Sequence, residues 1–402
     1  MGFLAVLGGN ELAVPAIRRF RELGHRVLSI DGNAQAPARE CADAFLHVNF
    51  SDIHALREGL KDFRLTGIMP INDFGVRPAS ILARERGLPG NSERTAMCGT
   101  SKALMRKAWS AAGLPQPRYA IFSVEEALAG NESDWQEFPA VIKPSYSGGG
   151  SRGVGLVNSW TEIRGWLADN RASFIDPEFL IEEYIQGTEH TAELLVWTGG
   201  ARLLSISDKQ NYSESVSVVQ NLYFPGPIGN DYRAEIEPLL HRASEALGMT
   251  AGTGHFEVLI RDGKVYLLEV GVRPGGGINL HPICLLSTGY DYAGLYACVL
   301  TGGEPTFDQS TPVHLAWHYF ESAAGRVLSI EGVENVRSEP DLVDVRIYQQ
   351  EGADAMDKRN DLARPGYVLV KGPTHEKARA RAIELSGRIR FQCAPSSTGT
   401  PN

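Results

Sequence analysis

The sequence has few cysteines, no long apolar run and no excess of basic residues. The scattered cysteines form no CxxC pair, which argues against a disulfide framework or a cysteine-based zinc site and indicates reduced thiols. No stretch of about 18 apolar residues occurs, so no segment is predicted to cross a membrane. The opening MGFLAVLGGN lacks the basic region and cleavage site of a secretory signal. We therefore expect a cytoplasmic protein. The five cysteines are Cys41, Cys98, Cys284, Cys298 and Cys393.

The charge balance is acidic. The chain carries 39 Lys and Arg against 48 Asp and Glu, a net charge of -9. Proteins that bind nucleic acid through the backbone present a basic face, so we expect no nucleic-acid partner. With 402 residues, of which 43% are hydrophobic, the chain is long enough for two or three domains, each with its own core.

Residues 3–95 alternate between strand and helix patterns, which predicts a parallel, open, Rossmann-like sheet. Gly8 and Gly9 follow the first apolar run, and Asp31 ends the second, which raises a dinucleotide site as an alternative. The spacing GGNELA lacks the G-x-G-x-x-G pattern that lets backbone approach a pyrophosphate. A Rossmann-like scaffold is therefore preferred over a nicotinamide-dependent dehydrogenase.

Prolines, glycines and changes of pattern divide the rest of the chain. A helix pattern near 101–113 ends at Gly113 and is followed by Pro115 and Pro117, which marks a boundary. Residues 205–233 are polar and irregular, and we interpret them as a substrate loop. After Gly303, four strand-like runs and one helical run predict a small α+β module. The predicted domains are 1–100, 101–185, 186–305 and 306–395.

Two glutamates interrupt an apolar hairpin, GHFEVLIRDGKVYLLEVGVRPGGG. A two-residue turn would place Glu257 and Glu269 on opposite faces. We therefore predict a three-residue loop with a bulge at Gly263, which pairs Glu257 with Leu267 and makes the two acids diagonal neighbours on the face of His255. Carboxylates this close suit Mg²⁺, which completes its shell with water and phosphate.

A lysine and a glycine-rich loop indicate a phosphate site. In VIKPSYSGGGSRGVG, Lys143 ends a strand just before the glycines. Glycine lets main-chain N–H groups approach a polyphosphate closely. Lys102, on the preceding helix, is a candidate for a second positive charge. The loop residues predicted to bind phosphate are Ser147, Gly148, Gly149, Gly150, Ser151 and Gly153.

Five motifs then follow in an order that resembles the ATP-grasp superfamily: Lys102, VIKP with its loop, IEEYIQGTE, HFE and LLEVGVRPGGG. Closest in pattern are the carboxylate–amine and L-amino acid ligases, whose terminal domain is similar to GRVLSIEGVENV and RPGYVLVKGPTHEKA. The resemblance covers nearly the whole chain. It implies an ATP-grasp fold of the α/β and α+β classes: an N-terminal Rossmann-like domain, a glycine-loop lid subdomain, a large subdomain and the C-terminal module.

The resemblance also implies roles for residues. Lys102 and Lys143 would contact ATP phosphates beneath the lid, and Glu189 would accept the ribose hydroxyls. Arg273 would stabilise an acyl phosphate and the tetrahedral state that follows it. His255 is a candidate substrate contact or proton acceptor, with a structural role as the equal alternative. The remaining implied contacts are the adenine hinge Glu182, Glu183, Tyr184 and Ile185, and Glu257 and Glu269 as ligands of two Mg²⁺ ions, with Mn²⁺ as the alternative metal.

One position departs from the pattern. Many ATP-grasp enzymes carry Glu-x-Asn-x-Arg where this chain has Glu269, Gly271 and Arg273. The expected activity is ATP-dependent joining of a carboxylate and an amine, both small molecules and most simply amino acids, through an acyl phosphate. A bicarbonate-activating or carbamoyl-phosphate-type enzyme and a non-catalytic ATP-binding module are the alternatives. Family resemblance also suggests a homodimer.

Overall fold

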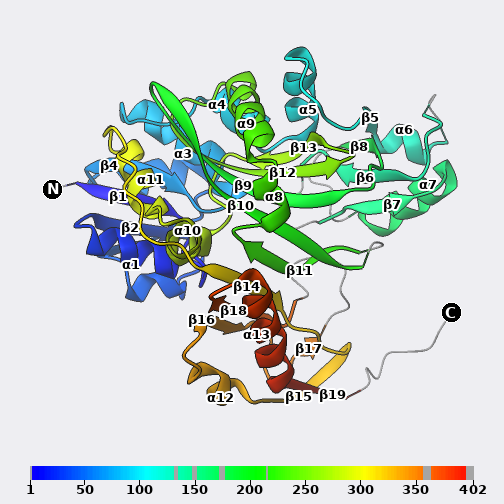
Figure 1. Cartoon of the computed structure of the whole chain (residues 1–402). Helices are drawn as coiled ribbons and strands as arrows, with labels where there is room; N and C mark the ends of the chain where they lie inside the picture. Colours follow the sequence, from blue (N-terminus) through cyan, green and yellow to red (C-terminus); the bar gives the residue numbers. More distant parts are fainter. Residues whose placement is uncertain are drawn as a thin grey trace.

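The computed structural model describes residues 2–130, 135–146, 152–171, 177–213, 216–355 and 364–394. Its N-terminal part is a parallel four-stranded sheet in the order β3-β2-β1-β4, flanked by helices, at the left of Figure 1. The parallel sheet predicted from the alternating pattern is confirmed. Its elements are β1 (Phe3–Leu7), α1 (Val14–Glu22), β2 (Arg26–Asp31), η1 (Pro37–Glu40), β3 (Ala44–His47), α2 (Ile53–Gly59), β4 (Leu65–Pro70), α3 (Asp73–Glu85) and α4 (Glu93–Cys98).

The glycine loop after β1 is hydrogen-bonded to the end of β2. The Gly9 amide donates to the Asp31 carboxylate over 2.7 Å, and the Gly8 amide donates to the Ile30 carbonyl over 2.9 Å. The acid that would hold a ribose in a dinucleotide site is thus already bonded to the glycine loop. This arrangement favours a scaffold over a dinucleotide site.

A second, antiparallel sheet of four strands, ordered β5-β8-β6-β7, follows helix α5 and lies at the right of Figure 1. Helices α6 and α7 cover it and share its apolar core, which includes Trp160, Phe179 and Ile142. Its strands fall within the predicted 101–185 segment. The elements are α5 (Lys102–Ala111), β5 (Tyr119–Ser123), α6 (Val124–Leu128), β6 (Ala140–Pro144), β7 (Gly155–Val157), α7 (Trp160–Asp169) and β8 (Glu178–Glu183).

The largest sheet has eight strands in the order β13-β12-β9-β10-β11-β14-β18-β16. Residues 205–233, expected to be an irregular loop, are mostly strand: β10 and β11 pair antiparallel, with Asp208 opposite Tyr223. The loop interpretation was wrong because polar side chains of these strands, such as Ser205, Ser207 and Asn221, are buried within the sheet, so polar composition did not mark a loop. The elements are β9 (Thr188–Trp197), β10 (Gly200–Ser213), β11 (Val216–Phe224), α8 (Pro227–Asp231), α9 (Arg233–Leu247), β12 (Gly252–Arg261), β13 (Lys264–Gly271), η3 (Asn279–Ile283), α10 (Cys284–Thr288) and α11 (Tyr292–Leu300).

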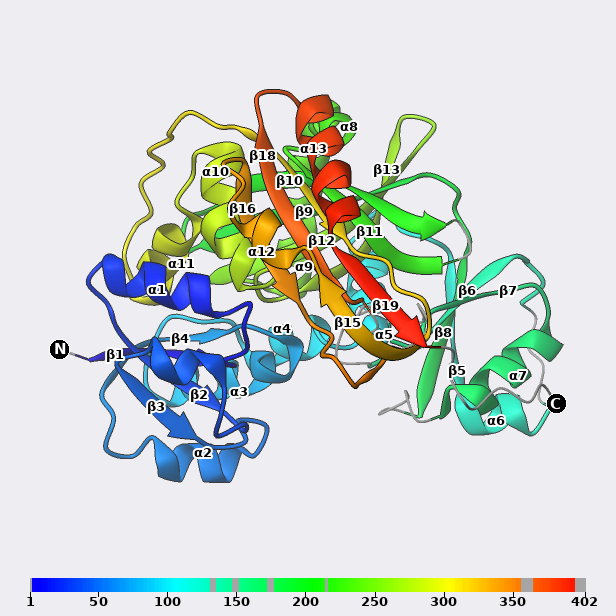
Figure 2. The same cartoon turned by 90° about the horizontal axis from the view of Figure 1, so that it is seen from below.

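The C-terminal segment extends this sheet. Strand β14 pairs with β11, and β18 pairs with both β14 and β16, while α13 packs on β14 and β18 (Figure 2). A separate three-stranded sheet, β17-β15-β19, completes the module. The elements are β14 (His314–Tyr319), β15 (Gly325–Glu331), α12 (Val333–Arg337), β16 (Leu342–Ile347), β17 (Asp354–Ala355), β18 (Gly366–Gly372), α13 (His375–Arg388) and β19 (Arg390–Ala394).

One face of the large sheet is buried beneath helices α5 and α9. Trp109 of α5 is fully buried there, packs in one core with Phe256 of β12, and donates its indole N–H to the Ala243 carbonyl over 3.3 Å. On the opposite face, Leu195 of β9 and Leu204 of β10 pack in a core with residues of α1 and α11, and the polar side chains lie towards the other end of these two strands. Within the described residues no helix is long and apolar enough to span a membrane, and the five cysteines are unpaired.

Candidate active site

A bulge in β13 brings the two hairpin acids together. The turn has two residues, Asp262 and Gly263, both with positive φ (49° and 73°), and pairs Arg261 with Lys264. The register then shifts at Leu268, so that Glu257 lies directly opposite Glu269. The predicted three-residue loop, with Glu257 paired to Leu267, was therefore wrong. The shared face is nevertheless present, because the extra residue sits in the strand instead of the turn.

The burial pattern of β13 shows what the bulge achieves. Before it, Val265 and Leu267 enter the core; after it, Val270 and Val272 do. Core positions therefore change from odd to even numbers. Without the bulge, Glu269 would point into the apolar core with Leu267.

Lys209 of β10 joins two acids of the polar face. Its Nζ lies 2.8 Å from Glu189 Oε2 and 2.9 Å from Glu257 Oε2. The positive charge of Lys209 lowers the pKa of Glu257 to about 2, although burial opposes this. Burial disfavours a charged Lys209, but the two carboxylates raise its pKa above the ordinary value. Lys209 and Glu257 are thus charged together at neutral pH.

Lys102 pairs with Glu269, the second acid of the hairpin. Its Nζ lies 2.9 Å from Glu269 Oε1, and its side chain is 9% exposed while that of Glu269 is 35% exposed. Burial lowers the pKa of Lys102, but the charge of Glu269 outweighs this and raises it. Ser101 caps α5 by accepting from the Leu104 amide, so Lys102 projects from a fixed helix start. The acids are open to solvent and the lysines lie behind them.

A buried arginine fixes the bulge. Arg106 makes a two-pronged pair with Glu182 (2.8 and 3.0 Å) and donates to the carbonyls of Leu267 (3.1 Å) and Leu268 (2.8 Å). Lys143 Nζ lies 2.6 Å from the second Glu182 oxygen. Burial would raise the pKa of Glu182, yet Arg106 and Lys143 hold it at about 2. Burial lowers the pKa of Lys143.

The predicted hinge, residues 182–185, begins with a buried glutamate, and the residues after it are less buried. Glu182 is 2% exposed and pairs with Arg106 and Lys143, so its carboxylate is not free to contact a ligand. The Glu183 amide donates to the Arg118 carbonyl, and its carboxylate pairs with Arg118 over 3.0 Å. Within the described residues, the Ile185 amide donates to no protein acceptor.

Five of the predicted phosphate-loop residues, 147–151, lie outside the described residues. The two ends of this loop are near α3: Tyr146 makes an edge contact with Phe74 (6.5 Å between centroids), and the Arg152 guanidinium lies 5.9 Å from the same ring. Gly153 adopts a positive φ of 72°. The loop therefore leaves and returns beside the N-terminal part of the chain.

Arg273 connects the hairpin to the N-terminal sheet domain. Its Nε and Nη2 donate to the two Asp73 oxygens over 3.0 and 3.1 Å. Burial would raise the pKa of Asp73, but the charge of Arg273 lowers it. A Cβ at Gly271 would lie 2.9 Å from the Arg273 Cζ, so the position that departs from the family pattern is where this guanidinium passes.

His255 belongs to a buried network around Glu193. The Glu193 oxygens accept from His255 Nδ1 (2.7 Å), Asn279 Nδ2 (3.1 Å), the Gly275 amide (3.3 Å) and the Tyr292 hydroxyl (3.0 Å). Burial raises the pKa of Glu193, but His255 and these donors lower it below the ordinary value. The Nδ1 atom of His255 is therefore engaged, and Nε2 is the atom left for a ligand.

The glycines after Arg273 are required by close packing. A Cβ at Gly275 would lie 2.3 Å from Glu193 Oε1, and one at Gly277 would lie 2.3 Å from the Leu12 carbonyl oxygen. The sequence analysis did not identify Glu193, Arg106, Lys209 or Asp73. Glu193, however, carries the signal that revealed the hairpin acids, because it too interrupts an apolar strand, TAELLVW.

Family comparisons agree with this geometry. An ATP-grasp domain model matches residues 136–281, and an L-amino acid ligase C-terminal domain 2 model matches residues 318–394. The D-alanine–D-alanine ligase of Methylibium petroleiphilum is 30% identical over 227 residues, covering 53% of this chain and 70% of that protein. An uncharacterized protein of Sinorhizobium fredii is 24% identical over 335 residues, covering 81% of this chain and 68% of that protein.

Solved structures show the same fold. The L-amino acid ligase of Bacillus licheniformis aligns with a TM-score of 0.85 and 22% identity, covering 98% of this chain and 99% of that one. Phosphoribosylglycinamide synthetase of Anaerococcus prevotii aligns with a TM-score of 0.74 and 18% identity, covering 98% of this chain and all of that one. The chain therefore belongs to the ATP-grasp family. It is a ligase of the carboxylate–amine class, as the sequence motifs predicted.

Replacing Arg106 tests the support of the bulge. Arg106→Met should destabilise the fold by about 3–5 kcal/mol, because Glu182 loses its two-pronged partner and two carbonyls lose donors. The double variant Arg106→Met with Glu182→Gln should recover part of the loss, because it removes the unpaired charge and keeps an acceptor for Lys143. Urea unfolding measures both. Equal stability of the single variant and the parent would contradict the role given to Arg106.

The low pKa of Glu182 predicts a pH dependence. Its folded-state pKa, about 2, is below the ordinary glutamate value of 4.5. The carboxylate therefore contributes stability above pH 4.5 and loses it as the pH falls towards 2. The difference in unfolding free energy between the parent and Glu182→Gln should be on the order of 3 kcal/mol at pH 6 and shrink at lower pH. Urea titrations at pH 6, 5, 4 and 3 check this; a constant difference would refute it.

Proposed function

We propose that this ligase activates a small carboxylate with ATP, as an acyl phosphate, and transfers the acyl group to an amine, releasing ADP and phosphate. The observation that carries the proposal is the direct opposition of Glu257 and Glu269, with a lysine paired to each. The products would be amides, and amino acids are the proposed substrates. The similarity of the chain to a D-alanine–D-alanine ligase and to an L-amino acid ligase supports that class.

The donor set fits magnesium bound with phosphate. Glu257 and Glu269 are each about a third exposed (33% and 35%) and offer the hard oxygens that Mg²⁺ prefers. Among the described residues, no cluster of three or more His, Cys, Asp or Glu could hold a metal. The rest of the shell would therefore come from phosphate oxygens and water. We propose two ions, held by both glutamates, which would neutralise the charge that develops between the terminal phosphates.

Lysines and backbone would hold the rest of the nucleotide. Lys102 and Lys143 would contact phosphate oxygens, with the loop from 147 to 153 folded over them. Glu189, held by Lys209, would accept the ribose hydroxyls. The Ile185 amide and the Glu183 carbonyl would meet the adenine edge, with Tyr184 between them. Glu182 would act from behind, by fixing Lys143 and Arg106 in place.

Arg273 and His255 would act on the reacting carboxylate. The guanidinium would stabilise negative charge on the acyl oxygen and on the departing phosphate. The His255 Nε2 atom, oriented by Glu193 on Nδ1, would contact the substrate or accept the amine proton. Enclosure of the reactive acyl group away from water would be the contribution of the lid. We place the domain boundaries near residues 100, 185 and 305, and propose a homodimer.

A phosphate-release screen with amino acids, singly and in pairs, tests the function. We expect ADP formation to require both a carboxylate and an amine, with the amide identified by mass spectrometry. Glu269→Gln should lower turnover by about a hundredfold or more, because it removes a charged metal ligand. Glu245→Gln, on the exposed side of α9, is the matched control and should match the parent.

Other outcomes of the same screen would decide against the proposal. Phosphate release that needs bicarbonate and no amino acid would support a carboxylase-type activity. ATP binding without ADP formation under every mixture would indicate a non-catalytic module. Parent-like turnover of Glu269→Gln would contradict the metal assignment.

The role of Arg273 can be separated from its contact with Asp73. Arg273→Ala should lower the rate about a hundredfold or more, roughly 3 kcal/mol, with little loss of ATP affinity. Asp73→Asn keeps the guanidinium and should retain most of the activity. Single-turnover rates and nucleotide calorimetry measure both variants. Equal losses in the two variants would mean that Arg273 acts by joining the domains and not on the reacting groups.

A further inference from the structure

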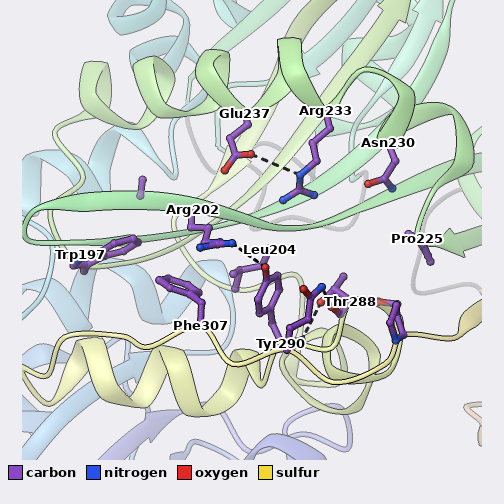
Figure 3. Close-up of a pocket in the computed structure, with 14 residues that line it drawn as sticks. Trp197, Arg202, Leu204, Pro225, Asn230, Arg233, Glu237, Thr288, Tyr290 and Phe307 are labelled. Carbon is purple, nitrogen blue, oxygen red and sulfur yellow. Dashed lines mark hydrogen bonds and ion pairs between the residues drawn. The ribbon is translucent and has the colours of Figure 1, made fainter.

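A cavity of about 640 Å³ lies at the far ends of β9 and β10 from the acid pair (Figure 3). Thr191, which lies opposite Glu257, and Trp197 are six residues apart on β9, which at about 3.3 Å per residue separates them by roughly 20 Å. The walls come from β9, β10, helices α8 and α9, and the chain after α10. The proposed ligase chemistry uses none of these cavity residues.

Arg202 of β10 is fixed in one wall. Its guanidinium lies 4.5 Å from the centroid of the Phe307 ring and 5.3 Å from that of Tyr290, and Nη2 donates to the Tyr290 hydroxyl over 2.9 Å. Across the described ranges, no carboxylate lies within ion-pair distance of it. Arg106 and Arg273, by contrast, each hold a carboxylate. Arg202 is therefore an oriented cation with donors to spare.

Aromatic rings form the surface beside this cation. Trp197 lies 5.5 Å from Phe307, and Phe307 lies 6.1 Å from Tyr290, both measured between ring centroids. Leu204 and Pro225 add apolar surface to the lining. Figure 3 shows Trp197 and Phe307 on one side of Arg202. A flat or apolar group would be desolvated well here.

The opposite wall is polar, and its charged side chains pair with one another and with the main chain. Arg233 Nε lies 3.6 Å from Glu237, and both side chains bond the main chain of Leu203, Arg233 at its carbonyl and Glu237 at its amide. Asn230 donates to the Gly226 carbonyl over 2.9 Å. These groups satisfy one another. Arg202 is left as the charge that a ligand would meet.

We propose that this cavity is a second ligand site, which binds a small organic carboxylate with an apolar or aromatic body. The carboxylate would take the free donors of Arg202, and the body would lie on Trp197 and Phe307. One uncompensated cation suits a singly charged anion and not a polyphosphate. The volume is in the range of pockets that enclose drug-sized molecules, which includes N-acylated amino acids.

Calorimetry without ATP tests the site, with N-acetylphenylalanine as the probe and its neutral amide as the matched comparison. We expect the acid to bind and the amide to bind at least about tenfold more weakly. Arg202→Gln should weaken binding of the acid by a similar factor. Arg202→Lys, which keeps the charge but loses the planar fork, should lie between. Arg18→Gln, on the exposed face of α1, should bind like the parent.

Two further variants separate this site from the active site. Binding should persist in Arg273→Ala and in Glu269→Gln, so it can succeed even if the ligase proposal fails. Tyr290→Phe, which keeps the ring but removes the hydroxyl, should weaken binding and serves if Arg202→Gln does not fold. No binding to the parent, equal affinity for acid and amide, or unchanged affinity in folded Arg202→Gln would each overturn the proposal.

Discussion

Arg106 reaches from α5 to a strand of each sheet that borders the active site. It pairs with Glu182 on β8 and donates to the Leu267 and Leu268 carbonyls of β13, on either side of the bulge. A bulge leaves carbonyls without their ladder partners, and leaving such groups buried and unpaired costs about 1–3 kcal/mol each. Donation from a charged, immobile guanidinium removes that cost. The bulge in turn sets Glu269 opposite Glu257, so the geometry of the proposed metal site depends on Arg106, which is not itself a proposed ligand.

The site as a whole is built from paired charges. Lys102, Lys143, Lys209 and Arg273 each lie within 3.0 Å of a carboxylate oxygen. A buried cation without a partner would be destabilising, so the acids hold these side chains in place, and they raise the pKa of Lys102 and of Lys209. A triphosphate accompanied by divalent cations adds little net charge. It can therefore exchange partners with these pairs without leaving a buried charge uncompensated.

Sequence patterns predicted the parallel N-terminal sheet, the acidic hairpin and its shared face, because each depends on local periodicity and turn chemistry. The position of the bulge could not be predicted, since an extra residue in the turn and one in the strand give the same facing. The β10–β11 hairpin was missed because it mixes polar and apolar residues without the bias of a core strand. Glu193 could have been found by the argument used for Glu257. Its four hydrogen-bond donors could not, because they come from segments up to 99 residues away in the sequence.

Gly271 stands where many ATP-grasp sequences have Asn, and the Arg273 side chain lies beside it. A side chain at Gly271 would begin 2.9 Å from the Arg273 Cζ, so an amide there and the present Arg273–Asp73 pair would compete for one volume. With glycine, the guanidinium passes over the strand and is held by the N-terminal domain, within the field of Glu269 and Glu193. A fixed positive charge therefore lies where a side chain at position 271 would begin. Because this charge is anchored on another domain, the relative placement of the two domains becomes part of the electrostatics around Glu269.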